Sequence, residues 1–331
     1  MKKELFKSVV LFILFGFILP ISAQTNLDTV KAQKFDTGKM WTFEDYPQAY
    51  IKSTYGFNAT EDWLKKVRLS ALIFGGGCSA SFVSEDGLIM TNHHCVDGSL
   101  ESVQKEGENI PKNGFFAPTL ADERKVPNLS VRQLVLIEDV TDPVLEAMNS
   151  GKTDAEKIEK RAAKIKELET TYGQQSGLSC RVTSLYNGAK FSLYGYKSYN
   201  DIRLAYSNER VVGLYGGDPD NFTYPRYDAD FAFLRAYDET GKPMKIENFF
   251  KFSQNGAVDN ELLFVVGNPG STQRLKTVAQ LEYYRDVTYR NSVFVLNRLF
   301  SIYDELIAEE PAKADEYRGQ QFFIGNAAKV S

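Results

Sequence analysis

The feature that most constrains this chain is the segment Thr91-Asn92-His93-His94-Cys95, which holds both of its histidines and one of its three cysteines. The segment follows an Asp86-Gly87 turn and the apolar run Leu88-Ile89-Met90. Histidine is the one side chain whose unperturbed pKa lies close to neutral pH. An imidazole that acts as a general base in this chain is therefore His93 or His94.

The first residues are typical of a secretory signal. Lys2 and Lys3 are positively charged, residues 9–21 are mostly apolar, and Ile21-Ser22-Ala23 forms a cleavage site of small residues. A membrane anchor is the weaker alternative, because a spanning helix needs about 20 apolar residues. We expect residues 1–23 to be a cleaved signal peptide and the mature chain to have no stable membrane span. We expect it in the periplasm or on the surface of a Gram-negative bacterium.

The order of features here resembles the surroundings of the general base in chymotrypsin-type peptidases. These features are a Gly-Cys strand end, a tight turn, an apolar strand and His-Cys. In an oxidising compartment this layout predicts a disulfide between Cys78 and Cys95, with Cys180 left over as a buried strand residue. His94 is then the expected base, and His93 points away into packing or a local hydrogen bond. One alternative is a turn with two structural histidines. A metal site is disfavoured because neighbours on a strand point to opposite faces, so we expect no metal and no cofactor.

Short β-rich runs separated by Gly and Asp predict a β-barrel domain. A helix is expected over residues 153–172, started by a Thr153–Glu156 capping box, ended by Gly173, and either alone or paired with 144–148. Other helices are expected at 61–69 and, beyond Thr277, over the aromatic-rich runs 281–289, 293–309 and 312–323. The expected strands are 71–74, 79–84, 88–91, 129–140, 178–186, 191–196, 202–206, 210–214, 230–235 and 262–266.

The candidate carboxylate partner of the base is Asp230, which begins the apolar stretch Asp230-Phe231-Ala232-Phe233-Leu234. A buried carboxylate needs hydrogen-bond donors, and an imidazole N–H is a suitable one. Asp228 is the main competitor, while Asp218 and Asp220 lie in a Gly-rich loop that fits turn chemistry better.

No convincing nucleophile accompanies this pair. Gly267-Asn268-Pro269-Gly270-Ser271 resembles the Gly-Asp-Ser-Gly loop of serine peptidases, but Pro269 occupies the nucleophile position and has no hydroxyl. Ser271 is a weak candidate, and a turn at the end of a strand explains the motif better.

Several motifs together resemble one family more closely than chymotrypsin-type peptidases in general. They are Gly75-Gly76-Gly77-Cys78, the His94 segment, residues 216–226 (Gly-Gly-Asp-Pro-Asp-Asn-Phe-Thr-Tyr-Pro-Arg) and Ala229-Asp230-Phe231. They resemble the bacterial dipeptidyl-peptidases of types seven and eleven, from about residue 44 to the end of the chain. These are exported serine exopeptidases with a chymotrypsin-like double β-barrel and an inserted α-helical domain.

The resemblance implies a role for each matching residue. His94 would be the general base and Asp230 its orienting acid, while the Asn221 side chain and the Phe222 carbonyl would bind the free α-amino group of the substrate. The family usually has Trp at the positions of Phe222 and Tyr224, and commonly Thr and Gly at those of Asp228 and Ala229. These departures affect the shape of the subsite more than its backbone contacts.

The resemblance also implies a domain plan. Residues 24–280 would be the N-terminal part of the peptidase domain, with a helical insertion at about 143–172, and 281–331 would begin the helical domain. The overall class would be mainly β with α insertions. The nucleophilic serine would lie beyond residue 331, so we expect this chain to be inactive by itself and the full-length protein to form a homodimer.

Composition argues against a nucleic-acid-binding protein. The formal net charge is −4 and no basic block occurs, so a nucleic acid is not an expected partner. Expected substrates are peptides with a free N-terminus. Two alternatives are a non-catalytic relative that binds peptide N-termini or a protein partner, and an endopeptidase of chymotrypsin type, which fits Asn221 and the helical insertion less well.

Overall fold

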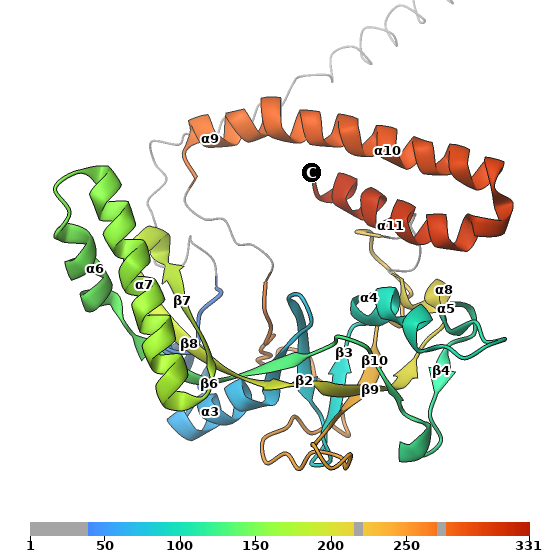
Figure 1. The fold of residues 1–331 in the computed structure, drawn as a ribbon, viewed down its shortest axis with the longest axis horizontal. Coiled ribbons are helices and arrows are strands. Elements are labelled where there is room, and N and C mark those ends of the chain that lie inside the picture. The colour runs from blue at the N-terminus through green and yellow to red at the C-terminus, as the bar shows by residue number, and fades with distance from the viewer. Residues whose placement is uncertain (1–38, 215–220, 270–275) are drawn as a thin grey trace, which may run out of the picture. The chain divides into compact units, whose positions relative to one another are not determined.

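The strands form one antiparallel sheet of ten strands in the computed structural model, which describes residues 39–214, 221–269 and 276–331. The strand order is β4-β9-β10-β3-β2-β1-β6-β8-β7, and β5 also pairs with β9 (Figure 1). This path ends at β4 and β7, so the described strands do not close into a barrel. The strands are β1 Ala71–Phe74, β2 Cys78–Phe82, β3 Leu88–Thr91, β4 Phe115–Phe116, β5 Arg124–Lys125, β6 Val131–Asp139, β7 Ser179–Leu185, β8 Lys190–Tyr199, β9 Asp201–Ser207 and β10 Ala232–Tyr237.

Helices flank the sheet, so the predicted combination of a β-sheet with helical additions is confirmed, but more of the described residues lie in helices than in strands. None of the described helices has the length and apolar character that a bilayer crossing demands. The chain divides into residues 1–40 and the unit Trp41–Ser331, and the predicted signal peptide lies outside the described residues. The α-helices are α2 Gln48–Tyr55, α3 Glu61–Ser70, α4 His93–Val96, α5 Ile110–Asn113, α6 Thr141–Asn149, α7 Asp154–Ser176, α8 Arg210–Gly213, α9 Val278–Tyr283, α10 Arg290–Glu309 and α11 Ala314–Val330.

The β2–β3 hairpin positions the histidine segment. Its turn needs glycine, because Gly87 has φ +70° and a Cβ there would lie 2.9 Å from the Ala236 carbonyl oxygen. Strand β3 lies between β2 and β10, and Thr91 pairs with Ala80 on one side and Ala232 on the other. This register brings the residues after Thr91 beside those that precede Ala232.

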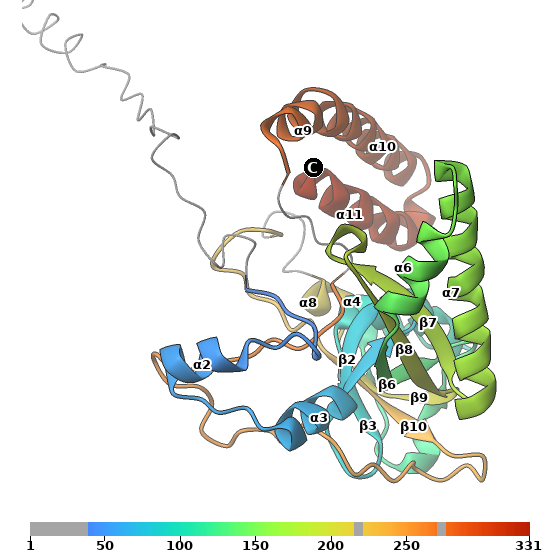
Figure 2. The ribbon, with the colours of Figure 1, turned by 90° about the vertical axis from the view of Figure 1, so that its left-hand side faces the viewer.

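Two hydrophobic clusters support the sheet. The larger one lies beneath the histidine segment and includes Phe82, Ile89, Val96 and Leu234, each at most 1% exposed. The smaller cluster, with Val144 and Leu193 at its centre, packs the α6–α7 hairpin against β7 and β8 (Figure 2). The alternating apolar residues of these strands therefore face the two clusters, as period-two patterning requires.

Of the two alternatives for residues 153–172, a lone helix or a helical hairpin, the structure has the hairpin, and the predicted C-terminal helices are confirmed. Helix α7 begins after Thr153, whose hydroxyl accepts from the Glu156 N–H at 3.2 Å, but it continues past Gly173 to Ser176 and ends at Gly177. Helices α10 and α11 pack against each other and are separated at Pro311, as predicted (Figure 1). A π-helical turn, Tyr284–Tyr289, joins α9 to α10.

Two predicted strands are wrong. Residues 210–213 form α8, because Gly213 packs against the His93 ring and Arg210 forms an ion pair with Asp97, contacts that override the strand preference of the valines. Residues 262–266 alternate between exposed and half-buried side chains but pair with none of the described strands. The segment His93–Val96 is also one helical turn and not a strand end, and Asp230 lies two residues before its strand.

Candidate active site

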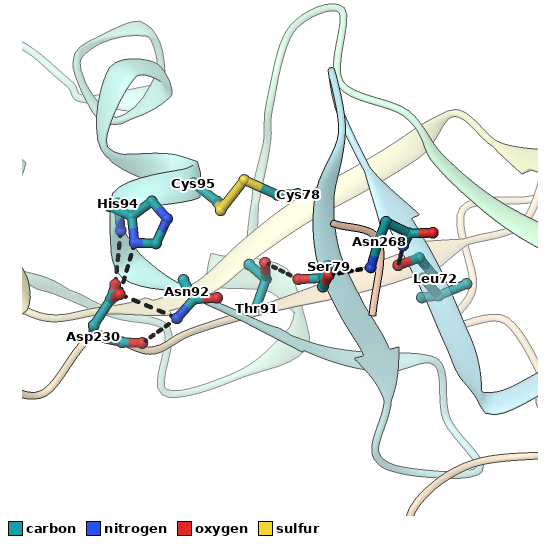
Figure 3. The surroundings of a disulfide bond; sticks show 9 residues. All are labelled: Leu72, Cys78, Ser79, Thr91, Asn92, His94, Cys95, Asp230 and Asn268. Atoms are coloured by element: carbon teal, nitrogen blue, oxygen red, sulfur yellow. Dashed lines mark hydrogen bonds and ion pairs between the residues drawn. A yellow bond between two sulfur atoms is a disulfide. The ribbon is translucent and has the colours of Figure 1, made fainter. Parts of the chain in front are cut away.

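His94 and Asp230 form a close pair at the ends of β3 and β10 (Figure 3). The His94 Nδ1 atom lies 2.6 Å from Oδ2 of Asp230, and the His94 backbone N–H donates to Oδ1 at 3.0 Å. Their side chains are 25% and 14% exposed, respectively. An ionised carboxylate only accepts hydrogen bonds, so Nδ1 donates, which leaves Nε2 as the nitrogen that carries the lone pair in the neutral form of the ring. This is the tautomer that a general base needs.

Asn92 completes the surroundings of Asp230. Its Nδ2 group donates to Oδ2 at 3.0 Å and to the Asp230 carbonyl oxygen at 3.2 Å (Figure 3). Burial by itself raises the pKa of Asp230, but the hydrogen bonds from the ring and backbone of His94 and from Asn92 outweigh it and lower that pKa below its usual value. The carboxylate therefore stays ionised at neutral pH.

The predicted disulfide between Cys78 and Cys95 is present, and it joins the start of β2 to the helical turn that carries His94 (Figure 3). Ligand atoms of Cys78, Cys95 and His94 lie within 4.8 Å of one another. Both sulfurs are already bonded to each other, so neither offers the thiolate that a metal ion needs. Cys180 is a free, half-buried thiol on β7.

His93 has a separate environment, as predicted. It is fully buried, its Nε2 lies 3.0 Å from the Asn208 carbonyl oxygen, and its Nδ1 has no hydrogen-bond partner among the described residues. Burial lowers the pKa of His93 despite the nearby Asp97 carboxylate. The ring is therefore neutral and donates through Nε2.

Asp228, the competing carboxylate, does not bind His94. Its Oδ1 atom is buried without a partner in the described part of the chain. Burial, followed by the charge of Asp230, raises the pKa of Asp228. The geometry therefore selects Asp230 as the partner of His94. Ser271, Asp218 and Asp220 lie outside the described residues.

Asn221 and Phe222 lie on the loop that precedes Asp230. Asn221 is 3% exposed, its Nδ2 donates to Oδ1 of Asn326 on α11 at 2.9 Å, and its Oδ1 accepts from Arg226 at 3.4 Å. Phe222 is 59% exposed and has φ +65°. A bulky residue rarely adopts this left-handed conformation, and such strain is concentrated at functional sites.

The family model for peptidase S46 matches residues 35–331. This chain belongs to the peptidase S46 family. The S46 chain is 31% identical over 277 residues to an Asp/Glu-specific dipeptidyl-peptidase from Shewanella putrefaciens, covering 79% of this chain and 37% of that protein. It is 28% identical over 263 residues to dipeptidyl-peptidase 7 from Phocaeicola vulgatus, covering 75% of this chain and 36% of that protein. The S46 chain thus spans little more than a third of the length of these relatives.

Solved structures support the fold of the S46 chain. The crystal structure of Porphyromonas endodontalis DPP11 in complex with substrate matches with a TM-score of 0.69 and 22% identity, over 86% of this chain and 45% of that one. The predicted family is confirmed.

Three residues that form hydrogen bonds to the candidate site residues were not predicted. Asn92 stands inside the histidine motif, so its position next to His93 was a usable signal. Asn208 and Asn326 reach the site only through contacts between segments distant in sequence, and nothing near them in the chain marks them.

Proposed function

We propose that this chain is part of an exported serine-type dipeptidyl-peptidase that removes dipeptides from the free N-terminus of peptides. His94 is the general base and Asp230 orients it. The contact of 2.6 Å between His94 Nδ1 and Asp230 Oδ2 carries this proposal. The dipeptidyl-peptidase names of the S46 relatives support the reaction class, and the disulfide supports export.

In the proposed reaction, a serine beyond residue 331 attacks the carbonyl carbon of the second peptide bond. Nε2 of His94 takes the hydroxyl proton as the new C–O bond forms, and Asp230 stabilises the imidazolium. The C–N bond then breaks as the imidazolium gives its proton to the leaving amine. Water, activated by the same nitrogen, cleaves the acyl-enzyme and releases the dipeptide.

The amine subsite is proposed to consist of Asn221 Oδ1 and the carbonyl oxygen of Phe222. An ammonium group only donates hydrogen bonds, so it needs such acceptors in a site that excludes bulk water. An amide oxygen has two lone pairs, so Oδ1 can accept from Arg226 and from the substrate together. Anchoring the terminus there would place the second peptide bond at the base.

We further propose that the antiparallel sheet belongs to a chymotrypsin-like double barrel. Three features support this architecture: the base lies three residues after β3, the carboxylate lies two residues before β10, and the cross-link lies beside the base.

The test uses the full-length protein and a peptide with a free N-terminus, with the N-acetylated peptide as the matched control. We expect dipeptide release from the free peptide only, labelling by a fluorophosphonate probe, and a loss of roughly 10²- to 10⁴-fold in kcat for His94→Ala. Unchanged turnover in His94→Ala would refute the assignment of the base. Binding of the free peptide without turnover or labelling would instead support the non-catalytic alternative.

A further inference from the structure

Asn208, directly after β9, contacts the backbone on both sides of Asp230. Its Nδ2 group lies 2.5 Å from the carbonyl oxygen of Ala229 and 3.3 Å from that of Phe231. Asn208 touches neither the Asp230 carboxylate nor the His94 ring in any described hydrogen bond. It binds the backbone on both sides of Asp230, whereas His94 and Asn92 bind the Asp230 carboxylate.

Tyr206 defines the orientation of the Asn208 amide. Its hydroxyl donates to Oδ1 of Asn208 at 2.5 Å, and its ring stacks on Phe231 at a centroid distance of 5.8 Å. The opposite amide orientation would place an NH₂ group against the Tyr206 hydroxyl and an oxygen against two carbonyl oxygens. Only one orientation satisfies all these groups, and in it Nδ2 donates to the two carbonyls.

The backbone at Asp230 needs such support because it lies outside the strand ladder. The Phe231 N–H donates to the Ala229 carbonyl at 2.8 Å, which makes Asp230 the central residue of a three-residue γ-turn. Strand β10, which pairs with β3 and β9, begins only at Ala232. Asn208 therefore supplies bonds to the turn that the sheet does not.

The same residue is attached to the histidine segment. The Asn208 carbonyl oxygen accepts from Nε2 of His93, the residue before the proposed base, at 3.0 Å. The His93 ring is held from its other side by α8, where a Cβ on Gly213 would lie 2.4 Å from Cγ of the ring. Asn208 thus bonds to the neighbours of both His94 and Asp230.

We propose that Asn208 is a positioning residue for the His94–Asp230 pair, with His93 as its link to the base segment and Tyr206 as the group that orients its amide. The inference rests on the proposed function of that pair. Asn208 contacts no reacting atom, and it acts by holding the acid-bearing turn and the base-bearing turn in one register.

The test compares Asn208→Leu with Gln133→Met in the full-length protein. Both changes replace an amide by an apolar side chain of similar size. Gln133 is a matched control because its Nε2 donates to the Leu69 carbonyl at 2.5 Å and its Oε1 accepts from the Tyr199 hydroxyl at 3.0 Å, in the same sheet but without contact to the pair. The two variants therefore lose the same kinds of bond.

For Asn208→Leu we expect kcat to fall by about 100-fold with little change in KM, because misplacement of a base by about 1 Å has an effect of this size. We also expect the pKa of Asp230, measured by carbon-13 NMR of its carboxyl group, to rise as its hydrogen bonds loosen. Gln133→Met should change neither quantity. An unchanged kcat and an unchanged Asp230 pKa in folded Asn208→Leu would overturn the proposal.

Tyr206→Phe is the second variant, for the case in which Asn208→Leu does not fold. It removes only the hydroxyl that orients the amide and keeps the ring on Phe231, so a smaller fall in kcat and a smaller rise in the Asp230 pKa are expected. A wild-type kcat together with a wild-type Asp230 pKa in Tyr206→Phe would count against the proposal. If the wild-type enzyme shows no turnover, the proposed function fails, and the Asp230 pKa in the variants still decides the positioning role.

Discussion

Replacing both cysteines of the disulfide by alanine, Cys78→Ala with Cys95→Ala, should lower the free energy of unfolding of the sheet by about 3 kcal/mol. The bond closes a loop with a sequence separation of 17. A crosslink over such a loop removes roughly 10 cal/mol/K of chain entropy from the unfolded state, which gives this value at 25 °C. Both sulfurs also pack against the larger hydrophobic cluster, so the loss of their contacts acts in the same direction.

Hydrogen exchange measures this loss locally in the full-length protein. A change of about 3 kcal/mol corresponds to exchange roughly 150-fold faster for core amides of β2 and β3 that exchange through unfolding of this part of the sheet. Amides of β7 and β8, which belong to the smaller cluster, should be affected less.

Cys180→Ala is the matched control, because it removes a cysteine that forms no disulfide. We expect it to leave exchange in β2 and β3 at the wild-type rate. If the double variant accelerates exchange there by less than about fivefold, constraint of the unfolded chain is not what the bond contributes, and the reasoning is refuted.

Three further predictions concern the surroundings of the pair. Asn92→Ala removes a donor to Oδ2 of Asp230, so the Asp230 pKa should rise, and a carboxyl titration by NMR that matches wild type would contradict this. Burial holds the pKa of His93 below its unfolded value, so the unfolded state binds the extra proton and stability should fall as pH drops below about 6.5. Denaturant midpoints at pH 7.0 and 5.5 should therefore differ more in wild type than in His93→Gln. An equal difference between the two pH values in both proteins would contradict this prediction. Gly213→Ala places a methyl group against the His93 ring and should cost about 1–3 kcal/mol, seen as a lower Tm; an unchanged Tm would show that the ring can move aside.

The sequence predicted those parts of the fold and site that depend on local pattern. Short β-rich runs bounded by Gly and Asp indicated β1, β3, β8 and β9, and helical spacing indicated α7, whose Ile165, Leu168 and Tyr172 pack against the smaller hydrophobic cluster. The pairing of His94 with Asp230 followed from the motif around each residue.

The errors arose where distant contacts decide the local structure. The run Arg210-Val211-Val212 has the β-branched residues of a strand, yet Gly213 must meet the His93 ring, and the chain turns as a helix to place it there. Residues 262–266 form the continuous apolar run Leu-Leu-Phe-Val-Val, but an apolar run does not show whether a partner strand lies alongside. Asn208 was missed for a related reason, because its side chain donates to backbone carbonyls that lie 21 and 23 residues further along the chain.

Asp230 binds the same residue twice, through the ring and through the main-chain N–H of His94. The two bonds close a small loop of atoms, so rotation about either side-chain torsion of the histidine breaks at least one of them. The imidazole is therefore held in one rotamer, as the proposed general base would need to be between turnovers. In the proposed reaction, each proton transfer would then need little rearrangement, and the speed of the chemical step would depend on where the peptide is held.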